Sequence, residues 1–253
     1  MKKSIAVFCT IFLLAGCGGR SKTEEITLTP PLDEMFETAY NYLDRRNFEQ
    51  AAQAFLDIES SYPTSPWAAE ALILAAYTQY LGGDFAATLS TIDRFMRFHP
   101  GHPNVDYVLY LRGMSFYRQV SDVRREPGMS GLALNTFTQL VQRFPDTEFA
   151  ENAQNKIVIL QNYIAGKIMH SARREMAREN WPIVITNMQR VITTMYNTQM
   201  TPEALFRLTE AYTAVGLPCQ AAGFAEMLRL NFPDNEWTAR LDAPPRRRWW
   251  RVW

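Results

Sequence analysis

Residues 48–67 read FEQAAQAFLDIESSYPTSPW, and this stretch decides the fold. Its apolar residues Ala51, Phe55 and Ile58 recur at helical spacing, which is typical of one buried face of an α-helix. Pro63 then ends the pattern, because proline lacks a backbone donor and clashes with the preceding turn. The stretch therefore predicts a helix, a turn and the start of a new helix.

The same pattern returns further along the chain. The other copies are FAATLSTIDRFMRFHPGHPN at 85–104, ALNTFTQLVQRFPDTEF at 133–149 and CQAAGFAEMLRLNFPDNEW at 219–237. An aromatic residue or a histidine precedes the proline in every copy. Self-similarity at a period of about 37 residues is typical of helical repeat arrays, and A-x3-F…P resembles the tetratricopeptide pattern.

The repeats predict an all-α fold, a superhelical array of about five tetratricopeptide-like helix pairs and thus about ten helices. The fourth repeat is degenerate, with Trp181 in the place of Phe48 and Tyr196 in the place of the proline. Its longer spacing and that of the third repeat predict insertions, one of them a loop at 119–131. No stretch alternates with a period of two residues for long enough to form a sheet.

Five segments follow from composition and from the repeats. They are a signal peptide at 1–16, a segment at 17–31 that begins with Cys17 and continues as a flexible tether, repeats one to three at 32–159, repeats four and five at 160–237, and an Arg/Trp-rich tail at 238–253. The tail ends in APPRRRWWRVW. It is either a disordered end or a contact to a partner or to lipid headgroups, because Trp and Arg favour interfaces.

The N-terminus resembles a bacterial lipoprotein signal. Lys2 and Lys3 precede a short apolar run, and Leu-Ala-Gly stands directly before Cys17, as in the lipobox. The resemblance implies cleavage before Cys17, a diacylglycerol on its thiol and an acyl chain on the new amino group. Gly18 is not the aspartate that favours retention in the inner membrane, so the resemblance favours the outer membrane. The alternative is a plain signal peptide with a chance cysteine.

Catalytic, metal and nucleic-acid functions find no support. The chain has no nucleophile elbow, zinc-protease helix, phosphate-binding glycine loop or paired C-x2-C, so we predict no enzyme, no metal and no cofactor beyond the acyl chains on Cys17. His99 and His102 stand beside prolines, which favours a turn over a metal site.

With 26 basic and 26 acidic residues, the chain is too balanced to indicate a nucleic-acid partner. Cys219 is interpreted as a small buried apolar residue.

Aromatic residues recur along one face of the first helix of each N-terminal pair. Helical spacing and register against the turns place seven candidates on the concave face: Phe36, Tyr40, Tyr77, Tyr80, Tyr107, Tyr110 and Tyr117. Tyrosine suits a groove that is partly exposed to solvent, because its ring is apolar and its hydroxyl group is polar. The stripe is either a site for an extended peptide or packing between helices with hydroxyls at the rim.

Charge differs between the two halves. Acidic residues outnumber basic ones in 18–159, and basic residues outnumber acidic ones in 160–253. Opposite signs indicate different partners at the two ends. Candidate contacts to an acidic partner in the C-terminal half are Arg173, Arg174, Arg190 and Arg207.

The lipobox, the short tether, the five repeats and the opening NFEQAAQAF…YPTSPWAAEA together resemble the BamD (ComL-type) family of outer-membrane β-barrel assembly lipoproteins. The resemblance implies a non-enzymatic scaffold, held by its lipid anchor on the periplasmic face of the outer membrane. Its C-terminal repeats would bind the POTRA domains of an Omp85-type barrel subunit. Its N-terminal groove would face unfolded outer-membrane protein clients or other assembly lipoproteins. The alternative is an adaptor for peptidoglycan hydrolases or proteases.

A Cys17→Ser variant tests the anchor. We expect it to lose all acylation and to be released from membranes, or to remain attached through an uncleaved signal, because serine offers no thiol to the acylating enzymes. Mass spectrometry of the N-terminal peptide provides the measurement. A wild-type mature N-terminus without acyl groups would contradict the lipobox assignment.

Overall fold

The computed structural model describes residues 30–120 and 128–243. The signal peptide, Cys17, most of the tether, the Arg/Trp segment from residue 244 onward and residues 121–127 lie outside the described residues. Every regular element in the described ranges is a helix, as the repeats predict. None of these helices is both long and apolar enough to cross a bilayer.

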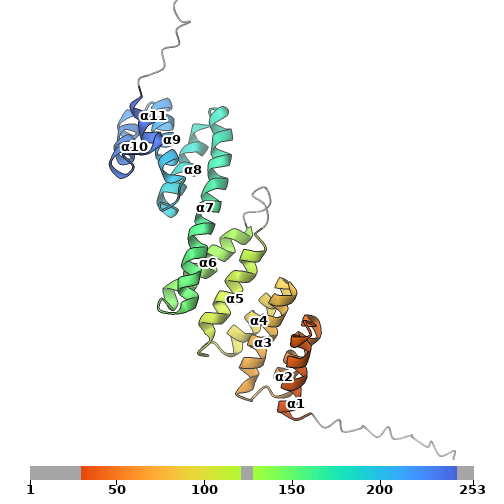
Figure 1. The fold of residues 1–253 in the computed structure, drawn as a ribbon. Helices are drawn as coiled ribbons and strands as arrows, with labels where there is room; N and C mark the ends of the chain where they lie inside the picture. Colours follow the sequence, from red (N-terminus) through yellow and green to blue (C-terminus); the bar gives the residue numbers. More distant parts are fainter. Residues whose placement is uncertain (1–29, 121–127, 244–253) are drawn as a thin grey trace, which may run out of the picture.

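Eleven helices follow one another along an elongated array, with α1 at one end and α11 at the other (Figure 1). The bounds are α1 Leu32–Asp44, α2 Phe48–Ser61, α3 Trp67–Gly82, α4 Phe85–Phe98, α5 Val105–Arg118, α6 Gly128–Arg143, α7 Glu148–Ala177, α8 Trp181–Thr194, α9 Thr201–Ala214, α10 Pro218–Asn231 and α11 Glu236–Asp242. The first ten form the five predicted pairs, and each helix packs on its neighbours in sequence.

Tight turns within the pairs require a left-handed residue. Gly83 and Gly216 occupy this position with φ of 79° and 77°, a conformation that glycine adopts without steric cost. In the first and fourth pairs the same position is filled by Arg46 and Glu179, with φ of 57° and 59°. A non-glycine residue in this conformation costs about 1 kcal/mol or more, which the packing of the two helices offsets.

The core is built from the repeat positions that the sequence singles out. Phe55, Phe137 and Leu228 have no exposed surface, which confirms the predicted register. Gly113 of α5 allows this packing in the third pair, because a Cβ built there would lie 2.4 Å from Cε1 of Phe137. A small residue opposite a large one thus sets how closely α5 and α6 approach.

The extra residues between the third and fourth repeats lie mainly in one long helix, α7. α7 has 30 residues, against 13 to 16 in α1–α6. Its first half, up to Leu160, joins the core shared with α3–α6, and its second half, from Ile164, joins the core with α8 and α9. The predicted division between residues 159 and 160 therefore lies inside one continuous helix.

Three details differ from the sequence-based expectations. The tail was expected from residue 238, but α11 continues to Asp242, buries Thr238 and packs on α9 and α10. The loop was expected to end at 131, but α6 begins at Gly128. Cys219 was expected to be buried and is exposed, because it lies in the first turn of α10, away from the face that packs on α9.

Two glycine variants test the close approach of α5 and α6. Gly113→Ala should lower the free energy of unfolding by about 1–3 kcal/mol, because the new methyl overlaps the Phe137 ring. Gly166→Ala in α7 is the matched control: its Cβ meets nothing within 4 Å, so it should raise stability by about 0.5–1 kcal/mol. Urea unfolding of both variants provides the measurement. Equal effects would mean that the ring does not pack on Gly113.

Candidate functional site

Four tyrosines from two neighbouring helices form one half-buried cluster. Tyr77 and Tyr80 come from α3, and Tyr107 and Tyr110 come from α5. Burial, with smaller contributions from Tyr77, Tyr80, Glu70 and Tyr110, raises the pKa of the Tyr107 phenol to about 12. Burial also raises the pKa of Tyr110, with a smaller contribution from Tyr80. Tyr107 and Tyr110 are therefore uncharged at neutral pH, and each offers a polar hydroxyl group on an apolar surface.

A hollow of about 480 Å³ opens beside this cluster, where α3, α5 and α7 begin. Tyr77, Tyr107 and Phe149 contribute rings to its wall, together with aliphatic side chains of α3. The Phe149 ring lies 5.3 Å from that of Tyr107 and 5.4 Å from that of Tyr110, measured between centroids. The hollow has the size and the mostly apolar lining of a site for side chains of a bound segment.

A second aromatic cluster lies in the first repeat. The rings of Phe36 and Tyr40 stack 6.2 Å apart, and the Tyr40 ring meets Phe55 edge-on at 5.5 Å. Phe36 also meets Trp67 of α3 edge-on at 6.1 Å. Trp67 is 55% exposed and Tyr40 is 44% exposed, so this cluster has a broad aromatic surface open to solvent.

The seven predicted aromatics are thus divided between two clusters, with Tyr117 at the far end beneath the ammonium of Lys156. Trp67 and Phe149 also belong to this surface, although they are not among the seven predicted aromatics. Both occupy the position four residues after a repeat proline, and this offset could have identified them. The tyrosine rings also pack against the core, so each is in part a packing residue.

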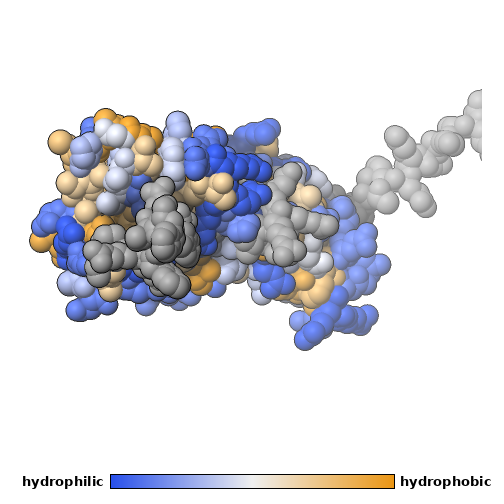
Figure 2. All heavy atoms as spheres, turned by 90° about the horizontal axis from the view of Figure 1, so that it is seen from above, coloured by the Kyte–Doolittle hydropathy of each residue, from blue (hydrophilic) through white to orange (hydrophobic). Residues whose placement is uncertain are grey.

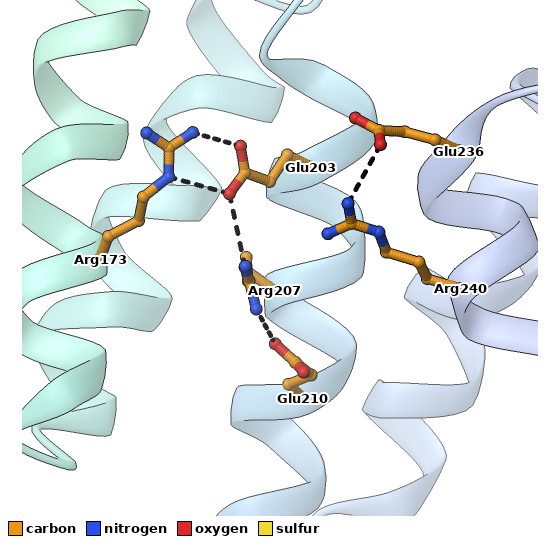
Figure 3. Close-up of polar contacts among 6 residues, drawn as sticks. All are labelled: Arg173, Glu203, Arg207, Glu210, Glu236 and Arg240. Atoms are coloured by element: carbon orange, nitrogen blue, oxygen red, sulfur yellow. Dashed lines mark hydrogen bonds and ion pairs between the residues drawn. The ribbon is translucent and has the colours of Figure 1, made fainter. Parts of the chain in front are cut away.

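A network of ion pairs joins α7 and α9 at the other end of the array, and a separate pair, Glu236 with Arg240, lies within α11 (Figure 3). Glu203 of α9 is buried, with 7% of its side chain exposed, and its carboxylate accepts hydrogen bonds from Arg173 of α7 and Arg207 of α9. Arg173 Nε lies 2.9 Å from Glu203 Oε1. Arg207 donates in turn to Glu210 at 2.8 Å. A fork-like guanidinium suits such shared carboxylates, and here it ties the long helix to the last pair.

Trp237 connects this network to α11. The guanidinium carbon of Arg207 lies 5.0 Å from the Trp237 ring centroid, and that of Arg240 lies at 4.2 Å. The Phe206 ring contacts the same indole at 5.3 Å. Cations over an indole face are attracted by its quadrupole, so α11 is held on α9 by its one tryptophan.

The four predicted arginines therefore divide into two kinds. Arg173 and Arg207 form ion pairs within the molecule, with Glu203 and Glu210. Arg174 and Arg190 are exposed, and no ion pair within residues 30–120 and 128–243 involves either of them. Acidic and basic residues are also equal in number in 160–243, so the basic excess of the C-terminal half comes from the arginines after residue 243.

Burial alone raises the pKa of the Glu203 carboxyl, because an ion loses hydration there. The hydrogen bonds and charges of Arg173 and Arg207 together outweigh this effect, so the pKa lies below its ordinary value. Glu203 is thus ionised at neutral pH and stabilises the folded chain in that form.

The two histidines of the inter-repeat turn have a packing role. The rings of His99 and His102 lie 5.7 Å and 5.5 Å from the Phe95 ring. Within the described residues, no group of three His, Cys, Asp or Glu side chains could hold a metal ion.

On the side of the molecule drawn in Figure 2, apolar residues form separate patches among hydrophilic ones.

Comparison with known proteins identifies the family. The model of YfiO, described as an outer membrane lipoprotein, matches residues 30–227. The chain belongs to this family. It is 32% identical to the outer membrane protein assembly factor BamD of Caulobacter vibrioides over 92% of this chain and 77% of that protein. It is 31% identical to BamD of Neisseria meningitidis serogroup A over the whole of both chains. It is thus an outer membrane lipoprotein of a non-enzymatic family of assembly factors.

Among solved structures, the TPR domain of P58(IPK) is similar, with a TM-score of 0.44 and 14% identity over 83% of this chain and 54% of that one. PilW, a type IV pilus biogenesis factor, has a TM-score of 0.39 and 12% identity over 85% of this chain and 99% of its own.

Replacing the buried carboxylate tests the network. Glu203→Gln should lower the free energy of unfolding by about 1–3 kcal/mol at pH 7, because Arg173 and Arg207 lose a charged acceptor. Since the folded-state pKa of Glu203 is depressed, the advantage of the wild type persists above the ordinary pKa of a glutamate. It disappears as the pH falls through the lower folded-state value.

Thermal unfolding of both proteins between neutral and acidic pH measures this difference. The control is Glu236→Gln, which breaks the exposed pair with Arg240 and should change stability by at most about 0.5 kcal/mol. A pH-independent difference between wild type and Glu203→Gln would refute the role of the ionised carboxylate.

Proposed function

We propose that this chain is a scaffold of the machinery that assembles outer-membrane β-barrel proteins, anchored on the periplasmic face by acyl chains on Cys17. Its N-terminal repeats hold client segments, and its C-terminal repeats hold the POTRA domains of the Omp85-type subunit. The observation that carries the proposal is the convergence of four tyrosines from α3 and α5 beside a hollow open to solvent.

The tyrosine cluster suits an unfolded barrel protein. An extended strand presents alternate side chains on one face, and strands of outer-membrane barrels carry aromatic residues at the membrane interfaces. Each aromatic pair contributes about 0.5–1.5 kcal/mol beyond the area that it buries. A few such contacts favour segments that carry aromatic side chains, but they are weak enough for the segment to be released again. Such release suits a step in which the client is passed on.

The C-terminal repeats suit a folded partner instead. The ion pairs around Glu203 and the indole of Trp237 fix α7, α9 and α11 relative to one another. Arg174 and Arg190 remain exposed on α7 and α8, where they can meet acidic groups of a POTRA domain. Charges of this kind act chiefly on the association rate and are sensitive to salt. Membership in a family of assembly factors favours this role over an adaptor for hydrolases or proteases.

A pair of double variants separates the two surfaces. Tyr77→Ala with Tyr110→Ala should weaken binding of a β-strand peptide from a barrel protein by about 1–3 kcal/mol and leave the affinity for purified POTRA domains unchanged. Arg174→Glu with Arg190→Glu should have the opposite effect, with a lower association rate at low salt. Surface plasmon resonance measures both interactions.

The matched controls are Tyr196→Ala, an exposed tyrosine outside the clusters, and Arg97→Glu, an exposed arginine of α4. Neither should alter either interaction. If one of the double variants weakens both interactions equally while its circular dichroism stays unchanged, the two surfaces do not act separately.

A further inference from the structure

The two ends of the tyrosine cluster carry opposite charges. α3 and α5 contact each other and, being the first helices of successive antiparallel pairs, run in the same direction, so their first turns lie at one edge. Glu70 and Asp106 come from these first turns. The helix dipole favours acids there, and these two carboxylates additionally line the hollow beside Tyr77 and Tyr107.

The opposite edge is basic. Arg118, in the last turn of α5, is close enough to Tyr80 to lower its pKa in part, against the larger effect of burial, which raises it. The ammonium of Lys156 from α7 lies 5.2 Å above the centroid of the Tyr117 ring. Two cations therefore lie at the end of the tyrosine surface that is remote from the hollow.

No ion pair among the described residues involves Glu70, Asp106, Arg118 or Lys156. Two of these four groups have a contact of another kind within the described residues: Asp106 Oδ1 accepts a 2.8 Å hydrogen bond from the Tyr107 N–H, and the Lys156 ammonium lies over the Tyr117 ring. Arg112, which also belongs to α5, differs because it pairs with Asp93 of α4. The charges along the tyrosine surface thus remain available to a ligand.

The span between the two edges corresponds to a short extended segment. Glu70 precedes Tyr80 by ten residues of α3, and Asp106 precedes Arg118 by twelve residues of α5. At a rise of about 1.5 Å per residue, these separations are about 15–18 Å along the helix axes. An extended strand covers that distance with about five or six residues.

We propose that this surface binds an extended segment in one orientation. The bound segment carries aromatic side chains against the tyrosines, a lysine or arginine at the Glu70 and Asp106 end, and a carboxylate at the Arg118 and Lys156 end. The hollow receives the aliphatic stem of the basic side chain, and the two carboxylates hold its charge. This inference rests on the proposed binding of client segments and specifies their charge pattern.

Synthetic peptides test the charge pattern. Each is an extended, aromatic-containing segment with Lys at one end and Glu at the other, Lys at both ends, Glu at both ends, or no charge. The full chain in detergent should bind the Lys/Glu peptide most tightly in fluorescence anisotropy, with an advantage of up to about fivefold for each matched charge. This advantage should shrink as salt rises from low to 1 M, because the charges are partly exposed.

Photo-cross-linking tests the orientation. A p-benzoylphenylalanine beside the Lys of the peptide should react near Leu74 and Tyr107, and one beside the Glu should react near Met114 and Tyr117. In a variant with Glu70→Lys, Asp106→Lys, Arg118→Glu and Lys156→Glu, the two patterns should exchange. The milder variant Glu70→Gln with Asp106→Asn should abolish the preference for the Lys end without reversing it.

The matched control is Glu49→Gln with Asp57→Asn, which removes two exposed acids of α2 and should leave affinity and orientation unchanged. If all peptides bind equally and cross-link at both ends, the proposed client binding stands and the orientation is refuted. If none of the peptides binds, both proposals are wrong.

Discussion

The array depends on one repeated contact, in which a large side chain of the second helix in a pair is buried against a small residue of the first. Phe137 against Gly113 is the clearest instance, because no side chain at all fits between them. A single helix pair cannot bury its apolar faces, so each pair is stable only when its neighbours cover it. The buried residues accordingly form successive clusters along the chain, and α7 contributes to two of them.

This stacking also positions the functional surface. Because successive pairs repeat the same antiparallel arrangement, α3 and α5 run parallel and present corresponding faces side by side. Tyr77 and Tyr107 are 30 residues apart in sequence, yet Tyr77 lies close enough to contribute to the raised pKa of Tyr107. The same geometry collects first-turn acids at one edge and last-turn cations at the other. Because α3 and α5 run in the same direction, the preference of first turns for acids and of last turns for cations gives the two edges of the binding surface opposite charges.

The candidate site could be predicted in part from sequence. The aromatic stripe follows from periodicity, and all seven predicted aromatics lie in or beside the two aromatic clusters of the N-terminal repeats. Arginines of the C-terminal half were harder to interpret, because charge composition does not say which cations are engaged. Arg173 and Arg174 are adjacent in sequence, but only Arg173 faces α9 and meets Glu203. A shift of one residue along the helix therefore decides whether an arginine forms an ion pair within the molecule or remains an exposed charge. The reason is that successive side chains point about 100° apart.

The sequence alone determined the fold class, the pairing of helices, the core positions and the family, because these depend on periodic patterns that are local in the chain. It also contained the turn glycines, whose left-handed conformation few other residues adopt easily. Only the tertiary structure decided that α7 is one continuous helix, that Cys219 is exposed and that Trp67 and Phe149 join the aromatic surface. These features depend on which faces of distant helices meet, and that is set by packing between segments rather than by any pattern within one of them.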